Sequence, residues 1–296
     1  MHKIKDYYLN EVDAFNDTIY CMHDLLGESD IPFHQHQKGQ FLYTEGGVIH
    51  VTTTDKTFFL PARHYMWIPP NQLHSIHPCS EHVTMRNLYF PVEENDVEFY
   101  AEIAIYPIND LLLQLILFTN RFQGHLYPDQ VSAYRASLAL KAILPEISLF
   151  QLPLALPYAK DKRLDTVINY INEHLQEILI FPDIAAQFGL SERSLSRLFQ
   201  SDVGMSFIQY LTIQRMIRAI QYLLVDKLSV KEVATMVGYN SIPTFSNTFY
   251  KTLGTRPSAY IKIKGVFGSA RVLAEKDILL SETDNYNKNN DNRFVL

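Results

Sequence analysis

The chain has 296 residues and a formal net charge of −6, which is long enough for two domains with buried cores. No apolar run reaches the roughly 18 residues that a membrane-spanning helix needs, and the first fifteen residues lack the apolar segment of a signal peptide. Cys21 and Cys79 are the only cysteines and match no metal-binding spacing. Reduced thiols in the cytoplasm are therefore expected, with a disulfide between the two as the weaker alternative.

The charge is unevenly distributed along the chain. Residues 160–264 carry thirteen Lys and Arg against nine Asp and Glu, an excess of four positive charges. Residues 1–159 carry nine against eighteen, and the tail from residue 265 carries four against five. The basic part is suited to contact phosphates, whereas the acidic first half argues against nucleic-acid contact there.

One pattern occurs twice between residues 181 and 260. An apolar segment containing alanine leads to Gly189 in the first copy and to Gly238 in the second, an offset of 49 residues. A later glycine follows at Gly204 and at Gly254, an offset of 50 residues. A repeated unit at fixed spacing predicts a tandem array. Each copy has the pattern of a helix-turn-helix: a short apolar helix, a tight turn with glycine and a second helix.

Capping residues indicate where the helices of the two copies begin. Ser191 is the expected N-cap of the second helix in the first copy. Ser229 and Glu232 form a capping-box pattern at the first helix of the second copy. Asn240 or Ser241 is expected to begin the last helix.

A longer helix is predicted between the two copies. Residues 206–225 carry apolar side chains at helical spacing and would form a rod of roughly 30 Å. Recognition helices that enter successive major grooves on one face of B-DNA lie about 34 Å apart. The spacing therefore favours a reader with two DNA-binding units on one chain, the alternative being a plain helical bundle.

Residues 164–262 resemble the DNA-binding domain of the AraC/XylS family of bacterial transcription regulators. The resemblance is carried by IAAQFGLSERSLSRLF, by Arg215 and Ala219 in the connecting helix, and by EVATMVGYNSIPTFSNTFYKTLGTRPSAY. It implies two helix-turn-helix units joined by a linker helix that bind adjacent major grooves of double-stranded DNA. It also implies a separate effector or dimerisation domain.

Residues 31 to about 92 show short alternating runs broken by glycine and proline, which predict a β-sandwich or barrel. Within them, FHQHQKGQFLYTEGG and FFLPARHYMWIPPNQLHSI resemble the cupin-like jelly roll at the front of many AraC-family regulators. Residues 1–30 are treated as an arm of uncertain structure. Apolar helices are expected over 107–122, with Asn109 as N-cap, and over about 129–150. They are expected to pack on the barrel or to form the seam of a homodimer, which the resemblance favours.

The predicted fold is therefore multidomain α+β, with a cupin-like barrel and helical dimerisation segment followed by an all-α tandem helix-turn-helix domain. The expected boundaries are 1–100 for the cupin-like domain with its arm and 101–159 for the dimerisation segment and linker. The DNA-binding domain is expected over 160–264, beginning with a helix at 164–178. A disordered tail is expected over 265–296 because it is rich in asparagine and poor in apolar residues.

The mouth of a barrel is a common site for small molecules. The candidates to bind an effector are His34, His36, Gln40, Tyr43, Trp67 and His74. The histidines resemble the ligand pattern of metal-binding cupins, which consists of two His, a Glu and a later His. Here Gln40 stands in the place of the Glu, and an amide oxygen is a weaker metal ligand than a carboxylate. A metal-free pocket is therefore the favoured interpretation, and a divalent metal at His34, His36 and His74 is the alternative.

In a helix-turn-helix, the second helix presents its outward side chains to base edges. Arg193 and Arg197 lie one turn apart in the first copy, and arginine is the best bidentate partner of guanine. The second copy has Asn247 where family members often place arginine, so the first copy is predicted to carry most of the direct specificity. Lys251 and Arg256 are expected to contact phosphates. The DNA-binding candidates are Glu192, Arg193, Ser194, Ser196, Arg197, Gln200, Asn240, Ser241, Ile242, Pro243, Thr244, Ser246, Asn247, Lys251 and Arg256.

These features together predict a sequence-specific transcription regulator that responds to a small-molecule effector. By resemblance, the regulator is expected to be an activator, to form a homodimer and to contact RNA polymerase. The alternative is a metal-dependent cupin enzyme fused to a DNA-binding module. No nucleophile triad and no phosphate-cradling glycine loop is evident, so an enzyme is not expected.

Overall fold

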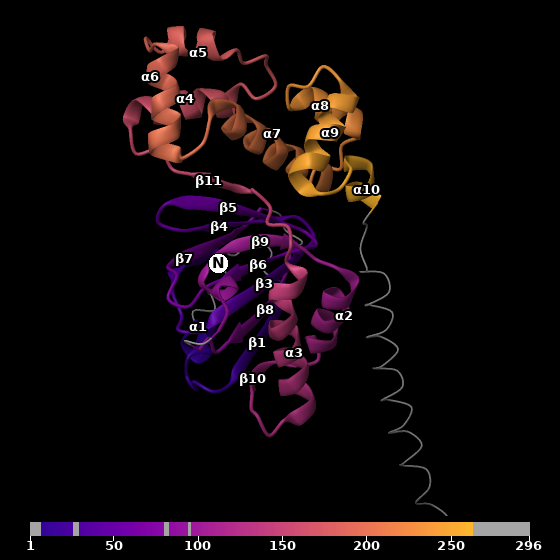
Figure 1. Cartoon of the computed structure of the whole chain (residues 1–296). Helices are drawn as coiled ribbons and strands as arrows, with labels where there is room; N and C mark the ends of the chain where they lie inside the picture. The colour runs from indigo at the N-terminus through magenta and orange to yellow at the C-terminus, as the bar shows by residue number, and fades with distance from the viewer. Residues whose placement is uncertain (1–6, 26–29, 80–82, 94–95, 263–296) are drawn as a thin grey trace, which may run out of the picture. The chain divides into compact units, whose positions relative to one another are not determined.

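Two antiparallel sheets form the N-terminal part of the chain (Figure 1). The computed structural model describes residues 7–25, 30–79, 83–93 and 96–262. The first sheet has the strand order β10-β1-β8-β3-β6-β9, and the second has the order β11-β5-β4-β7-β2. The strands are β1 (Ile19–Leu25), β2 (Ile31–His34), β3 (Gly39–Glu45), β4 (Val48–Thr52), β5 (Lys56–Pro61), β6 (His64–Ile68), β7 (His74–Pro78), β8 (Thr84–Phe90), β9 (Ala104–Pro107), β10 (Gly124–Leu126) and β11 (Ala155–Pro157). The predicted jelly-roll-like domain is confirmed.

Four strands lie where the sequence did not predict them. β1 falls inside the segment treated as an arm, which also contains α1 (Tyr7–Val12). β9, β10 and β11 fall inside the segment predicted to be helical. β1 pairs with β8 and β10, and β11 pairs with β5, so the partners lie roughly sixty to a hundred residues away. Such distant pairing leaves little local signal in the sequence, least of all in β9, β10 and β11, which have only three or four residues each.

Aromatic side chains cover the face of the first sheet that carries the helices. The ring of Phe41 stacks on that of Tyr65 with 5.0 Å between centroids. The indole nitrogen of Trp67 donates to the carbonyl of Tyr100 at 3.0 Å, and the Tyr100 hydroxyl donates to the carbonyl of Lys141 at 2.6 Å. Lys141 belongs to α3 (Val131–Ile147), which lies beside α2 (Asp110–Thr119) in Figure 1. These contacts attach the helical segment to the sheet.

His64 on β6 gives this domain a predicted sensitivity to acid. Its side chain is buried, and burial lowers its pKa to about 4. In the unfolded chain the imidazole titrates near pH 6.5. The unfolded state therefore binds more protons between pH 6.5 and pH 4, and stability falls as the pH falls through this window. At pH 5 the expected loss relative to pH 7.5 is about 2 kcal/mol for this residue.

Urea unfolding at pH 7.5 and pH 5, followed by the fluorescence of Trp67, measures this loss, because Trp67 is the only tryptophan and is buried in the domain. In a His64→Leu variant the difference between the two pH values should shrink by the same amount. An unchanged difference would contradict the assignment.

The C-terminal part of the described chain is helical. Its elements are α4 (Lys162–Glu173), α5 (Phe181–Gln187), α6 (Glu192–Leu198), the π-turn η2 (Phe199–Val203), α7 (Phe207–Leu224), α8 (Val230–Met236), α9 (Ile242–Leu253) and α10 (Pro257–Lys262). The pairs α5–α6 and α8–α9 are the two predicted helix-turn-helix units, and α7 is the predicted connecting helix. Within the described chain, no helix is both long and apolar enough to cross a membrane. The predicted disordered tail lies outside the described residues.

The predicted caps are confirmed. The Ser191 hydroxyl accepts from the backbone N–H of Ser194, and Ser241 does the same for Thr244. Ser229 and Glu232 form a complete capping box at α8. In the N-terminal part, the side chain of Asn109 caps α2 as predicted. Cys21 and Cys79 are free thiols.

The predicted helix over 164–178 is wrong at its C-terminal end, because α4 stops at Glu173. The N–H of His174 still bonds back into α4, but the following carbonyls turn away. The carbonyls of Leu175 and Glu177 accept from the guanidinium of Arg215 on α7, at 3.2 Å and 2.7 Å. The guanidinium of Arg215 thus supplies the hydrogen bonds that the next helical turn would otherwise give to these carbonyls. This is a tertiary contact, which the local sequence does not reveal.

Candidate DNA-binding surface and ligand site

The first helix-turn-helix presents two arginines on the exposed face of α6. Leu195 is buried, whereas Arg193 and Arg197 are exposed one helical turn apart. Glu192, Ser196 and Gln200 are also exposed, and Ser194 is half-buried with its hydroxyl 2.9 Å from that of Ser191. Among the described residues, neither arginine forms an ion pair with Glu192. Both guanidinium groups are therefore available to an outside partner.

The second helix-turn-helix gains a positive charge from outside its recognition helix. Asn247 is exposed on α9, and its side-chain oxygen accepts from the guanidinium of Arg256 at 2.6 Å. The same guanidinium lies 3.4 Å from the hydroxyl of Ser246 and 5.0 Å from the ring centroid of Tyr250. The sequence placed Arg256 only as a separate phosphate contact. The structure instead attaches it to the residue expected to read bases.

The remaining candidates of the second copy lie around the same helix. Phe245 and Phe249 face the core, which turns the opposite side of α9 outward. The exposed candidates on or beside α9 are Asn240, Ser241, Ile242, Pro243, Thr244 and Lys251. Most of these side chains carry no charge, so contacts to apolar groups and single hydrogen bonds are what this face can offer.

Arg215 connects the parts of this helical domain. Besides its bonds to the carbonyls of Leu175 and Glu177, its guanidinium lies 5.5 Å from the ring centroid of Tyr239, which follows the turn at Gly238. One side chain from the middle of α7 thus contacts the segment after α4 and the turn between α8 and α9. These contacts give Arg215 a structural role, which the resemblance to the family pattern alone did not indicate.

The structure divides the six predicted effector residues into two groups. Successive side chains of a strand point to opposite faces, and Gln40 and Tyr43 on β3 are three positions apart. Trp67 is the cross-strand partner of Phe41 and shares the face of Tyr43. Tyr43 and Trp67 therefore lie on the helix-covered face of the sheet and do not join the other candidates, which corrects that part of the prediction.

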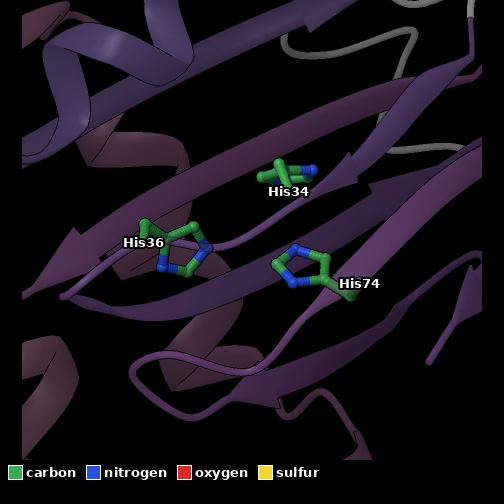
Figure 2. Close-up of side chains that lie close together, drawn as sticks. All are labelled: His34, His36 and His74. Atoms are coloured by element: carbon green, nitrogen blue, oxygen red, sulfur yellow. The ribbon is translucent and has the colours of Figure 1, made fainter. Parts of the chain in front are cut away.

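The other four candidates come together between the two sheets. His34 ends β2, His36 lies in the following loop, Gln40 belongs to β3 and His74 begins β7. The ring centroids of His34 and His74 are 4.3 Å apart, and those of His36 and His74 are 5.3 Å apart. Figure 2 shows the three imidazole rings beside one another. Gln40 and His74 are fully buried.

Each imidazole of this cluster is oriented by a backbone carbonyl. The Nδ1 atoms lie 2.8 Å from the carbonyl of Pro32 for His34, 2.5 Å from that of Lys38 for His36, and 2.8 Å from that of Gln72 for His74. Burial lowers the pKa of His34 and of His36, and it lowers the pKa of His74 to about 3. The rings are therefore neutral near pH 7. Neutral imidazoles held in this way are suitable ligands for divalent transition metals.

Two family models match the chain. A model described as "AraC-like ligand binding domain" matches residues 20–96, and one described as "Helix-turn-helix domain" matches residues 184–263. The HTH-type transcriptional regulator NimR of Escherichia coli K12 is 27% identical over 248 residues, which cover 82% of this chain and 86% of NimR. The uncharacterised HTH-type transcriptional regulator YfiF of Bacillus subtilis is 31% identical over 91 residues, 31% of this chain and 29% of YfiF.

Among solved structures, the C-terminal domain of AraT, a response regulator from Geobacillus stearothermophilus, is similar over 35% of this chain and 87% of that domain. The identity is 31% and the TM-score is 0.34. The two family models, in this order on one chain, match the two domains seen in the fold. The chain thus carries an AraC-like ligand-binding domain followed by an AraC-type helix-turn-helix domain, and the relatives that it resembles are named HTH-type transcriptional regulators.

Proposed function

We propose that each chain reads two successive major grooves of double-stranded DNA, with α6 in one groove and α9 in the next. The observation that carries this proposal is the pair of capped recognition helices on either side of a single connecting helix. α7 has 18 residues, which corresponds to about 27 Å at 1.5 Å per residue. The exposed Arg193 and Arg197, together with Arg256, supply positive charge that can bind phosphates. Their guanidinium groups can also donate hydrogen bonds to guanine.

We also propose that the regulator acts as a homodimer and activates transcription through contact with RNA polymerase. The dimer is supported by apolar side chains exposed on α2 and α3. Leu111 is 57% exposed, and Val131 is 49% exposed. Large apolar side chains that remain exposed on neighbouring helices are typical of protein interfaces. The activating role rests on the family resemblance alone.

The ligand-binding domain would control this activity through a molecule bound between the two sheets. A ligand shifts a conformational balance only when it binds one state more tightly than the other. The cluster of His34, His36, Gln40 and His74 supports this location. The relatives are named as transcriptional regulators, which points to a DNA-binding rather than a catalytic role.

Genomic binding-site mapping with the intact chain, followed by footprinting on a mapped site, tests this proposal. Two grooves per chain predict protection of about two helical turns, roughly 20 base pairs, for one chain, and about twice that length for a dimer. The logarithm of the affinity should fall linearly with the logarithm of the salt concentration. Protection of one turn only, or binding without sequence preference, would contradict the two-groove reader.

A further inference from the structure

The histidine cluster presents one kind of atom toward its centre. A carbonyl oxygen only accepts hydrogen bonds, so the Nδ1 atoms of His34, His36 and His74 carry the ring hydrogen toward Pro32, Lys38 and Gln72. A neutral imidazole has one N–H. The Nε2 atom of each ring therefore bears a lone pair and no hydrogen.

Gln40 adds a fourth acceptor to the same place. Its Oε1 lies 3.1 Å from Nε2 of His36 and 3.2 Å from Nε2 of His74. Its Nε2 donates to the side-chain oxygen of Asn87 at 2.7 Å, and this bond turns the amide oxygen toward the imidazoles. Gln40 and Asn87 are both fully buried.

In the part of the chain that the structure describes, no group donates a hydrogen bond to these four atoms, the three Nε2 atoms of the histidines and Oε1 of Gln40. The contacts between Gln40 and the two rings join one lone pair to another, because neither side has a hydrogen to share. The Nε2 atom of His34 is buried and has no hydrogen-bond partner among the described residues. Buried acceptors without donors destabilise a folded domain. A cation bound among these four atoms would remove that penalty.

We propose that His34, His36 and His74, with Gln40 as a fourth ligand, form a binding site for a late first-row divalent metal ion such as Zn²⁺. One ligand nitrogen from each histidine lies within 4.8 Å of the other two. A shift of roughly 1 Å brings the three within reach of one ion at about 2.1 Å from each. Imidazole nitrogen selects such ions over Mg²⁺ or Ca²⁺, which prefer oxygen.

The amide of Gln40 gives the site a particular character. All four ligands are neutral, so the bound ion keeps its two positive charges inside the domain. A carboxylate in this position would hold the ion more tightly, and the amide therefore favours reversible binding. This inference rests on the proposed function and deepens it, since it makes a transition-metal ion the ligand through which the N-terminal domain is regulated.

Cobalt titration of the purified full-length chain, stripped with a chelator, tests the site. Co²⁺ bound by three imidazoles in a four-coordinate site is expected to absorb in the visible range, with one ion per chain and displacement by Zn²⁺. His74→Ala is expected to weaken binding about a hundredfold or more, since loss of an outer-shell partner alone costs tenfold to a hundredfold. His77→Ala is the matched control on the same strand, and it should bind as tightly as the unaltered chain.

Gln40→Glu keeps the shape of the side chain and should bind the ion more tightly, by about tenfold or more. This gain does not depend on whether the alanine variant folds, which the fluorescence of Trp67 reports. If both amides were reversed, Gln40 would donate to the imidazoles and the cluster would need no ion. Absence of cobalt binding by the unaltered chain, or unchanged affinity in Gln40→Glu, would therefore overturn the proposal.

Affinity for a mapped DNA site, measured with and without Zn²⁺, separates the two proposals. A metal-dependent change of fivefold or more, absent in His74→Ala, is expected. DNA binding that ignores a metal bound at this cluster would overturn its regulatory role. Failure to bind any specific DNA in either state would overturn the proposed function, while the cobalt titration still decides the metal site.

Discussion

Replacing Gly238 with alanine is expected to destabilise the DNA-binding domain by about 3 kcal/mol or more. Gly238 has a φ of +77°, a conformation that costs an alanine about 1 to 2 kcal/mol. In addition, a Cβ atom there would lie 2.5 Å from the carbonyl oxygen of Leu175 and 2.4 Å from a guanidinium nitrogen of Arg215. That nitrogen, Nη2, donates to the carbonyl of Glu177, and Nε of the same guanidinium donates to the carbonyl of Leu175. Neither neighbour can therefore move without loss of a hydrogen bond.

Gly189→Ala is the matched control, because Gly189 occupies the same turn in the first copy. Its φ is +67°, but no atom of the described residues, apart from its chain neighbours, lies within 4 Å of the position of an added Cβ. The expected loss is therefore only the conformational cost of about 1 to 2 kcal/mol. Urea unfolding of the full chain followed by far-UV circular dichroism measures both variants. Equal losses in the two would show that the contact with Leu175 and Arg215 has no energetic role.

Arg197→Ala is expected to reduce affinity for a mapped site by about tenfold to a hundredfold, with a much smaller effect on random DNA. The reason is that a bidentate contact of arginine to guanine contributes about 1 to 3 kcal/mol of discrimination. Asn247→Ala should cost less specificity. Bidentate reading of adenine needs both the oxygen and the nitrogen of the asparagine amide, and the oxygen of Asn247 is already bonded to Arg256.

Fluorescence anisotropy with the mapped duplex and with a scrambled duplex of equal length measures this difference. Lys251→Ala serves as a control for charge, because loss of a phosphate contact lowers the affinity for both duplexes alike. If Arg197→Ala and Asn247→Ala lost specificity equally, the predicted dominance of the first copy would be wrong.

Features set by nearby residues were predictable from the sequence. Caps such as Ser191, Ser229 and Asn109 act on an N–H three residues later, so a short pattern is sufficient to place them. The face of a sheet on which a side chain lies is equally local information. Gln40 and Tyr43 are three positions apart in one strand, so the alternation of side chains predicts that they lie on opposite faces.

Features set by distant residues were not predictable. β11 is identified by its pairing with β5, about a hundred residues earlier. The contact between Arg256 and Asn247 depends on how the chain turns after α9, and the bond from Gln40 to Asn87 depends on the register between β3 and β8. The sequence placed each of these residues in a plausible element but contained no signal for the partner.

The contacts of Arg215 have a consequence for the evolution of target promoters. A side chain that holds the segment after α4 and lies against Tyr239 leaves the two reading units little freedom to rotate separately. One inserted base pair turns everything beyond it by about 35° around the duplex axis. In the proposed two-groove mode, binding sites for this protein therefore tolerate base substitutions more easily than insertions or deletions between the two grooves.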